Sequence, residues 1–422
     1  MGFASVDAMV AALTAGQKLR VPYNKITTAA TTGTAGRAYD FCALNGSPFA
    51  MGHGEHLINS YAPATLYNWT ANGTGFAATA NVFAKTSGTA TTLTADSMNK
   101  AIVSGRYYRV QYTISAWTSS NVNFTLGGAT GTNRAAIGTF VEIITASSTA
   151  GFVLTASINT GVFSVSNISI VEWGATSGDS PMFCPATQST TPSLYHGGDV
   201  STDTKHLLSV GMMTTAATGV GNALLVDVLG SYPYINANSS SLQSFFNTNV
   251  IPRYVNGEGV KAILVSRGTG YSGNATAIGA TPHNIQIAYT NSGNTGSRTL
   301  PITTAATVSA YNGQIASSGV AANNYGPYLP QANGDAGVKS VQSLQLSAGS
   351  GTANTYYDLV LVRELSNIPI PAANVYYERD FFSQVPSGER VYDGAVLSFI
   401  HVAGGALAAS TTFIGHIEVG WD

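Results

Sequence analysis

The chain has 422 residues, of which 18 are Lys or Arg and 20 are Asp or Glu, so its formal net charge is -2. Charged residues make up 9% of the sequence, against about 25% in an ordinary soluble domain. This balance excludes a nucleic-acid-binding protein, which needs a basic surface to neutralise phosphates. Hydrophobic residues make up 44% of the chain, which is enough to build cores and excludes intrinsic disorder.

The N-terminal residues predict one helix. Apolar side chains recur at helical spacing between residues 4 and 15, Ser5 can cap the first turn, and Gly16 ends the pattern. The segment has no basic region followed by an apolar stretch, so we expect no signal peptide. The apolar residues from Gly394 to Gly415 include His401 and several glycines, which favours two strands over a membrane span. We therefore expect no membrane association.

Residues 61–180 predict an inserted β-sandwich. Short apolar segments alternate with Gly, Ser and Asn turns, and apolar and polar residues alternate strictly between Tyr108 and Ile114. The alternation slips by one residue between Val165 and Ile168, which is typical of a β-bulge.

The flanking segments predict a second β-rich domain interrupted by the first. Residues 1–60 and 181–422 would form it, with strands centred on the segments HLLSVGMM, NALLVDVL, VKAILVSR, NIQIAY, TYYDLVLV, GAVLSFIHVA and TFIGHIEVGW. Two segments, 239–247 and 374–384, could form short helices. The predicted fold class is all-β, with β-sandwich or jelly-roll domains, one N-terminal helix and a few short helices.

The sequence motifs for catalysis and cofactor binding fail their context tests. A GxGxxG pattern at Gly268, Gly270 and Gly273 is followed by another strand and by no acidic residue at the required distance, which indicates a hairpin loop. His53, Glu55 and His56 form a possible metal-binding set, but they lie in a glycine-flanked loop rather than on one face of a helix. We therefore expect no cofactor, no metal and no enzymatic activity.

The chain contains 2 cysteines, Cys42 and Cys184, which flank the predicted insert. Closing the insert would bring their segments together, so we expect the two Cα atoms to lie within about 12 Å of each other. A chain that folds in a reducing cytosol does not require the disulfide bond.

Aromatic residues in the insert have two interpretations. Trp69, Trp117, Tyr107 and Tyr112 could form a platform on which a sugar stacks, or they could fill the core, where large rings bury much apolar area. Trp117 follows the apolar alternation and precedes a polar turn, so we expect it to be the most exposed of the four.

Charged residues fall into two sets that could form an interface with a capsid or another subunit. For the C-terminal set, the alternative is a network of ion pairs that orders local loops. A basic N-terminal arm contains Lys18, Arg20, Lys25 and Arg37. A C-terminal charged cluster contains Arg363, Glu364, Glu378, Arg379, Asp380 and Arg390.

The insert resembles the carbohydrate-binding-module type of jelly roll found in virion proteins of tailed phages. The resemblance spans residues 66–173 and implies a fold more than it implies sugar binding, because the matching residues are mostly core and turn positions. These residues are Trp69, Gly105, Tyr107, Val110, Tyr112, Ile114, Gly127, Gly128, Gly138, Asn167, Ile168 and Ile170.

Most of the remaining chain is similar to a family of structural proteins of phage heads. The segments that carry this similarity are FASVDAMVAALTAGQKLRVPYNKI, LYHGGDVSTDTKHLLSVG, AANNYGPYLPQANGDAGVKSVQS, ERDFFSQVPSGERVYDGA and FIGHIEVGW. The resemblance implies a virion structural protein on the capsid exterior, a cement, decoration or head-spike protein that assembles in the host cytoplasm. Its partners would be the major capsid protein and further copies of itself, with a trimer favoured.

Two alternatives remain. A tail-fibre or receptor-binding protein would use the insert to bind a cell-surface glycan, with Trp69 and Trp117 as stacking residues. A polysaccharide-degrading enzyme would need a pair of carboxylates, and the sequence nominates none. A fibre would also need a long stalk, which the sequence does not contain.

Overall fold

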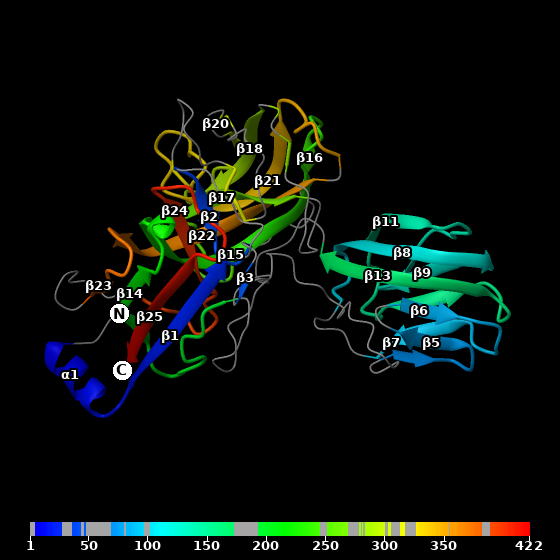
Figure 1. Ribbon diagram of the computed structural model, residues 1–422, viewed down its shortest axis with the longest axis horizontal. Helices are drawn as coiled ribbons and strands as arrows, with labels where there is room; N and C mark the ends of the chain where they lie inside the picture. Colours follow the sequence, from blue (N-terminus) through cyan, green and yellow to red (C-terminus); the bar gives the residue numbers. More distant parts are fainter. Residues whose placement is uncertain are drawn as a thin grey trace. The chain divides into compact units, whose positions relative to one another are not determined.

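The structure is a computed structural model. It describes residues 5–27, 36–43, 46–47, 69–79, 82–96, 102–172, 193–244, 251–268, 278–279, 281, 283–299, 303–304, 313–316, 326–353, 355–381 and 389–422. The chain divides into two compact units (Figure 1). Unit 1 combines Met1–Gly54 with Ala175–Asp422, and unit 2 is the continuous segment Glu55–Gly174. The fold is all-β, as predicted.

Unit 2 is a sandwich of two five-stranded antiparallel sheets. Sheet C has the order β10-β9-β12-β7-β4 and sheet D the order β11-β8-β13-β6-β5. The strands are β4 (Trp69–Ala71), β5 (Phe76–Thr79), β6 (Val82–Lys85), β7 (Thr92–Ala95), β8 (Tyr107–Ser119), β9 (Val122–Leu126), β10 (Ala129–Thr130), β11 (Gly138–Thr145), β12 (Val153–Ala156) and β13 (Val162–Glu172).

The connections of unit 2 are those of a jelly roll. From β6 to β13, the chain crosses to the other sheet at every connection except the one between β9 and β10. The predicted alternation is confirmed in β8, where Tyr108, Val110, Tyr112 and Ile114 are buried. The predicted bulge is confirmed as well, because the register between β13 and β8 shifts after Ser166.

Unit 1 contains three antiparallel sheets. Sheet A has the order β23-β14-β25-β1-β3, and sheet B the order β17-β22-β15-β24-β2. Sheet E has the order β16-β21-β18-β19, and β20 also pairs with β18. The strands are β1 (Lys18–Thr27), β2 (Ala38–Asp40), β3 (Gly46–Ser47), β14 (Lys205–Thr214), β15 (Gly221–Asn236), β16 (Gln243–Ser244), β17 (Val260–Gly268), β18 (Asn284–Asn291), β19 (Arg298–Thr299), β20 (Thr303–Thr304), β21 (Val338–Leu346), β22 (Tyr356–Ile370), β23 (Tyr377–Asp380), β24 (Leu397–Ala403) and β25 (Thr412–Trp421).

Sheet B contributes to three hydrophobic cores, one of which contains Val226, Val360 and Ile400. One end of the long strands β15 and β22 packs against sheet A, through Leu225 and Ile368. The other end packs against sheet E, through Tyr232 and Leu359. This sharing is possible because β15 and β22 are 16 and 15 residues long and shift register at several points along their pairing.

The N-terminal helix is confirmed as α1 (Val6–Thr14), and the Ser5 side chain accepts a hydrogen bond from the Ala8 N–H at 3.0 Å. It lies at one end of the outer face of sheet A. A Cβ atom at Gly420 would come within 3.0 Å of Leu13 of the helix, so glycine at this position makes room for it. Among the described residues, no helix is long and apolar enough to span a membrane.

One predicted short helix is wrong and the other is corrected in part. Residues 377–380, within the predicted helix 374–384, form edge strand β23, which pairs with β14. Within 239–247, Gln243–Ser244 is strand β16, and residues 245–247 lie outside the described part of the chain. The remaining helical element in the described residues is a single 3-10 turn, Ala217–Gly219.

Candidate functional site

The outer face of sheet A joins the two predicted charged sets around a histidine. Along β25, Phe413, Ile417 and Val419 are buried in the core. His416 and Glu418 therefore lie on the opposite face, because side chains alternate along a strand. His416 lies opposite Gly211 of β14, and Gly211 lies opposite Glu378 of β23.

Polar contacts converge on both nitrogens of His416. Arg20 of β1 places Nη2 3.2 Å from Nδ1, and the Tyr376 hydroxyl also hydrogen-bonds Nδ1. Nε2 lies 3.2 Å from the Glu378 carboxylate and 3.1 Å from the Ser209 hydroxyl. We name this set Arg20, Ser209, Tyr376, Glu378 and His416 the sheet A cluster.

Gly211 explains how the cluster is packed. The Tyr376 ring stacks on the His416 ring with a centroid distance of 5.8 Å and an interplanar angle of 6°. A Cβ atom at Gly211 would lie 2.7 Å from the Tyr376 ring, so a larger residue would displace the tyrosine. Burial lowers the pKa of His416, Arg20 lowers it further, and Glu378 opposes the shift. The neutral imidazole is thus favoured at neutral pH.

The rim of the cluster is exposed and partly apolar. Val375, Tyr376 and Tyr377 expose 44%, 42% and 37% of their surface, and Ile414 on β25 exposes 37%. Strand β23 is also the edge of its sheet. An exposed edge with apolar and charged side chains is a surface on which a protein partner can bind.

Two residues of the predicted basic arm are not on the surface. Lys25 is fully buried and Arg37 exposes 3% of its surface, so the prediction that they contact a shell or another subunit is wrong. Lys25 lies on the inner face of β1, with Val21 and Tyr23. Burial lowers its pKa to about 7, and Cys42 and Asp40 oppose the shift. Lys18 and Arg20 are exposed on the same strand.

The C-terminal charged cluster divides between several places. Glu378 belongs to the sheet A cluster, and Asp380 lies two residues further along β23, opposite Ser209. Arg379 donates a hydrogen bond to the Asn367 carbonyl at 3.0 Å. Glu364 accepts a hydrogen bond from the Tyr328 hydroxyl at 2.8 Å. The remaining members, Arg363 and Arg390, lie beside a pocket of unit 1.

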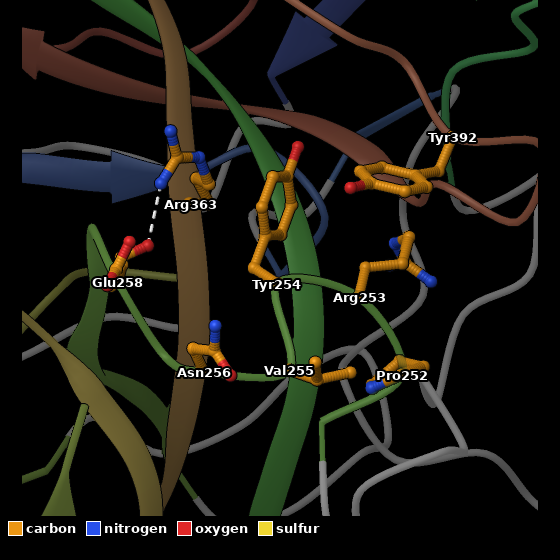
Figure 2. A pocket seen from close by; sticks show the side chains of 8 residues that line it. All are labelled: Pro252, Arg253, Tyr254, Val255, Asn256, Glu258, Arg363 and Tyr392. Carbon is orange, nitrogen blue, oxygen red and sulfur yellow. Dashed lines mark hydrogen bonds between the residues drawn. The ribbon is translucent and has the colours of Figure 1, made fainter. Parts of the chain in front are cut away.

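This pocket has a volume of about 400 Å³ (Figure 2). The residues that line it are Pro252, Arg253, Tyr254, Val255, Asn256, Glu258, Arg363 and Tyr392. The Tyr254 and Tyr392 rings meet edge to face at 5.2 Å. Arg363 stacks over Tyr254 at 4.6 Å, and Arg390 over Tyr392 at 4.3 Å. None of the tyrosines in the pocket was predicted as a site residue, because nothing in the sequence relates positions 254 and 392.

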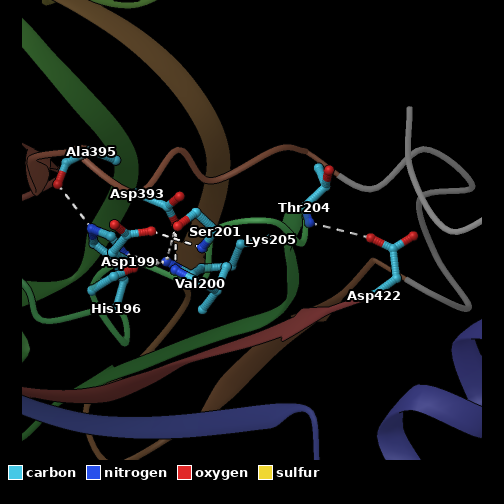
Figure 3. A network of polar contacts seen from close by, with 10 residues as sticks. His196, Asp199, Val200, Ser201, Thr204, Lys205, Asp393, Ala395 and Asp422 are labelled. Atoms are coloured by element: carbon cyan, nitrogen blue, oxygen red, sulfur yellow. Dashed lines mark hydrogen bonds and ion pairs between the residues drawn. The ribbon is translucent and has the colours of Figure 1, made fainter.

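A third polar group surrounds the buried Lys205, at the start of β14 (Figure 3). Its ammonium group donates to His196 Nδ1 at 3.2 Å and pairs with Asp393 at 3.2 Å. His196 Nε2 lies 3.0 Å from the Ala395 carbonyl, so Nε2 carries the proton. Burial and the neighbouring Lys205 lower the pKa of His196 to about 4. These contacts tie the turn-rich segment 196–204 to the segment before β24, which is a structural role.

The insert does not present the predicted stacking residues as a platform. Trp69 exposes 6% of its surface and packs against Phe83 and Phe152 in the core, so the prediction for Trp69 is wrong. Trp117 is half-buried, and its indole N–H donates to the Ser120 carbonyl at 2.7 Å. Tyr112 is buried, and Tyr107 is half-buried.

Several sequence predictions lie outside the described residues. These are the distance between Cys42 and Cys184, the loop with His53, Glu55 and His56, and the glycines 270 and 273. Cys42 itself is buried, and its thiol hydrogen-bonds the Ser398 hydroxyl at 2.9 Å. Within the described part of the chain, no group of three His, Cys, Asp or Glu residues is arranged to bind a metal ion.

No protein-family model and no curated protein sequence matches the chain. Among solved structures, the chain is similar to the N-terminal CBM22 tandem domain of Xyn10C from Paenibacillus barcinonensis. That match has 10% identity, covers 74% of this chain and 98% of the other, and has a TM-score of 0.23.

It is also similar to the structure of the Gx strain of infectious bursal disease virus, with 9% identity, 96% and 80% coverage, and a TM-score of 0.15. A VP2 subviral particle of the same virus matches with 10% identity, 96% and 80% coverage, and a TM-score of 0.13. These TM-scores are too low to assign a fold family or a function to the chain.

Proposed function

We propose that this chain is a structural protein of a tailed-phage virion, attached to the capsid exterior by unit 1 as a cement, decoration or head-spike protein. Its partners would be the major capsid protein and further copies of itself, a trimer being favoured. The proposal builds on the sequence resemblance to phage head proteins. The single observation that carries it further is the sheet A cluster, which combines residues from distant parts of the chain on the outer face of one sheet, inside an exposed rim.

The chemistry of this face suits a macromolecular partner. The cluster contains a cation, a carboxylate, a histidine and a tyrosine, and an exposed apolar rim surrounds it. Such mixed surfaces bind other proteins through large contact areas, and the contacts gain strength when many copies bind one shell. Unit 2 is a continuous segment between the two parts of unit 1, so it can be displayed without taking part in the attachment.

The test is to ask whether purified protein rebinds shells that lack it. Arg20→Ala and Glu378→Ala each remove one charged side chain of the cluster, and we expect either change to abolish most rebinding. A charged contact that loses its partner at an interface costs about 2–5 kcal/mol, and the loss recurs at every copy. Arg134→Ala is the matched control, because Arg134 pairs with Glu142 within unit 2.

Full rebinding by both cluster variants would contradict the proposal that the sheet A cluster is the attachment surface. Hydrolysis of a host polysaccharide by the purified protein would contradict the class of function. The receptor-binding alternative, in which the insert binds a glycan, gains no specific support, because Trp69 is in the core and Trp117 is hydrogen-bonded and half-buried.

A further inference from the structure

We propose that the pocket of unit 1 between Tyr254 and Tyr392 is a binding site for a neutral sugar. This proposal is independent of the capsid attachment proposed above, which rests on other residues of unit 1. It also differs from a glycan site in the insert, because every residue that lines the pocket belongs to unit 1.

The charges of the pocket favour a neutral ligand. Arg253 is already engaged by Asp227 in a bidentate ion pair, with contacts of 2.8 and 2.7 Å. Of the other lining residues, Arg363 carries a positive charge and Glu258 a negative charge. Beside the lining residues, Arg390 over the Tyr392 ring adds a positive charge, and Glu389, which helps to raise the pKa of Tyr254, adds a negative one. The pocket therefore lacks the excess of positive charge that an inorganic anion would need.

The shape and chemistry of the walls favour a sugar among neutral ligands. Tyr254 and Tyr392 contribute aromatic carbon atoms to the walls, against which the C–H groups of a sugar ring can pack. Asn256 and Glu258 are exposed at the pocket and provide polar groups for hydroxyls. A cavity of about 400 Å³ lies within the range of small-molecule sites, and a purely apolar ligand would leave these polar groups unpaired.

Two polar atoms of the pocket residues have unmet hydrogen-bonding capacity. The Tyr254 hydroxyl oxygen and Arg363 Nε are both buried and have no hydrogen-bond partner in the described part of the chain. Leaving such groups unsatisfied destabilises a protein, and both atoms belong to residues that line the pocket.

The pocket is also held in one conformation. Tyr254 has a backbone φ of 51°, a left-handed conformation that is unfavourable for a bulky side chain and that clusters at functional sites. The Gly257 N–H donates to the Tyr254 carbonyl at 2.6 Å, and Arg363 donates to the Glu258 carbonyl at 2.6 Å. A loop fixed before binding loses less conformational entropy when a ligand binds.

Saturation-transfer NMR with the full chain tests the proposal. The probes are methyl glucoside, methyl galactoside, N-acetylglucosamine, glucuronate and inorganic phosphate. We expect at least one of the three neutral sugars to bind with a dissociation constant on the order of 1 mM. Asn256→Ala and Glu258→Gln should each weaken this binding about tenfold, the effect of one lost hydrogen bond. Trp117→Ala, in unit 2, is the control and should bind as the unchanged protein does.

Three results would overturn the proposal. The first is that no neutral sugar binds. The second is that only phosphate or glucuronate binds, which would make the pocket an anion site. The third is sugar binding that Trp117→Ala abolishes and the two pocket variants leave intact, which would place the site in the insert.

Discussion

Individual buried histidines make the stability of unit 1 depend on pH. His401 lies in the core beside Phe413, at a centroid distance of 4.8 Å, and burial lowers its pKa to about 4. The unfolded chain keeps a histidine pKa near 6.5. Between these values the unfolded state binds a proton that the folded state does not bind. The contribution of His401 to the free energy of unfolding is therefore complete above about pH 6.5 and is lost as the pH falls towards 4.

Replacing His401 by leucine should remove its share of this pH dependence. We expect the free energy of unfolding to fall less between pH 7 and pH 4 in His401→Leu than in the unchanged protein, by up to about 3 kcal/mol. Urea unfolding at several pH values measures the difference. Parallel pH profiles for the two proteins would show that His401 titrates normally in the folded state. His196, whose pKa is also lowered to about 4, should keep part of the dependence in the variant.

Alanine substitutions of two lysines on strand β1 should differ sharply in their effect on stability. Lys25→Ala removes a fully buried side chain and leaves a cavity, so we expect it to destabilise the chain by about 2–4 kcal/mol. Lys18→Ala changes an exposed position and should stay within about 0.5 kcal/mol. Lys25→Met keeps most of the side-chain volume, so it should lower the free energy of unfolding less than Lys25→Ala does. Thermal unfolding of the three variants checks this order, and equal losses at positions 18 and 25 would contradict it.

At the scale of elements, local sequence patterns identify the strands, but they do not identify which strands pair with one another in a sheet. The alternation of apolar residues in β8 and β25 follows from one buried face and is visible in the sequence. The same alternation in TFIGHIEVGW places His416 opposite the core, and this signal could have nominated it. The short segment 374–384 was mispredicted because its strand is completed by pairing with β14, a contact that local sequence does not encode.

The candidate sites cannot be predicted from the sequence for the same reason, because they depend on pairing between strands that are distant in the chain. Arg20 and His416 are separated by 396 positions and meet only because β1 pairs with β25. Tyr254 and Tyr392 meet across a loop and the segment before β24. Proximity in the sequence does not separate exposed residues such as Arg20 from buried ones such as Lys25, because successive side chains of β1 point to opposite faces of the sheet.

The ion pair between Asp227 and Arg253 should support the pocket loop. Asp227 of β15 also accepts a hydrogen bond from the Val396 N–H at 2.9 Å, so it joins three segments. Asp227→Ala leaves the Arg253 guanidinium buried without its partner and should cost about 3–5 kcal/mol. The double variant Asp227→Ala, Arg253→Met should lose less than Asp227→Ala alone, because no buried charge remains. Calorimetry measures both, and a more severe loss in the double variant would contradict the argument.

At the scale of the whole molecule, the two units have separate cores. The core of unit 2 lies between its own two sheets, and the jelly-roll connections leave its strands paired within the unit. We expect that replacing residues 55–174 by a short Gly/Ser linker leaves a folded, soluble unit 1 that still rebinds shells. Circular dichroism and the rebinding assay check this, and an aggregated product would contradict the independence of the units.

The pairing of β1 with β25 sets the order in which the two units can fold on the ribosome. Nine residue pairs, from Lys18 with Gly420 to Ile26 with Thr412, join the first strand to the last (Figure 1). Translation proceeds at about 5–20 residues per second, so β1 waits roughly 20–80 s for its neighbour to be synthesised. Unit 2 is complete long before that moment and can fold during translation. Nascent unit 1 therefore exposes the apolar side of β1 for most of its synthesis, a period in which a chaperone or premature self-association would act on it.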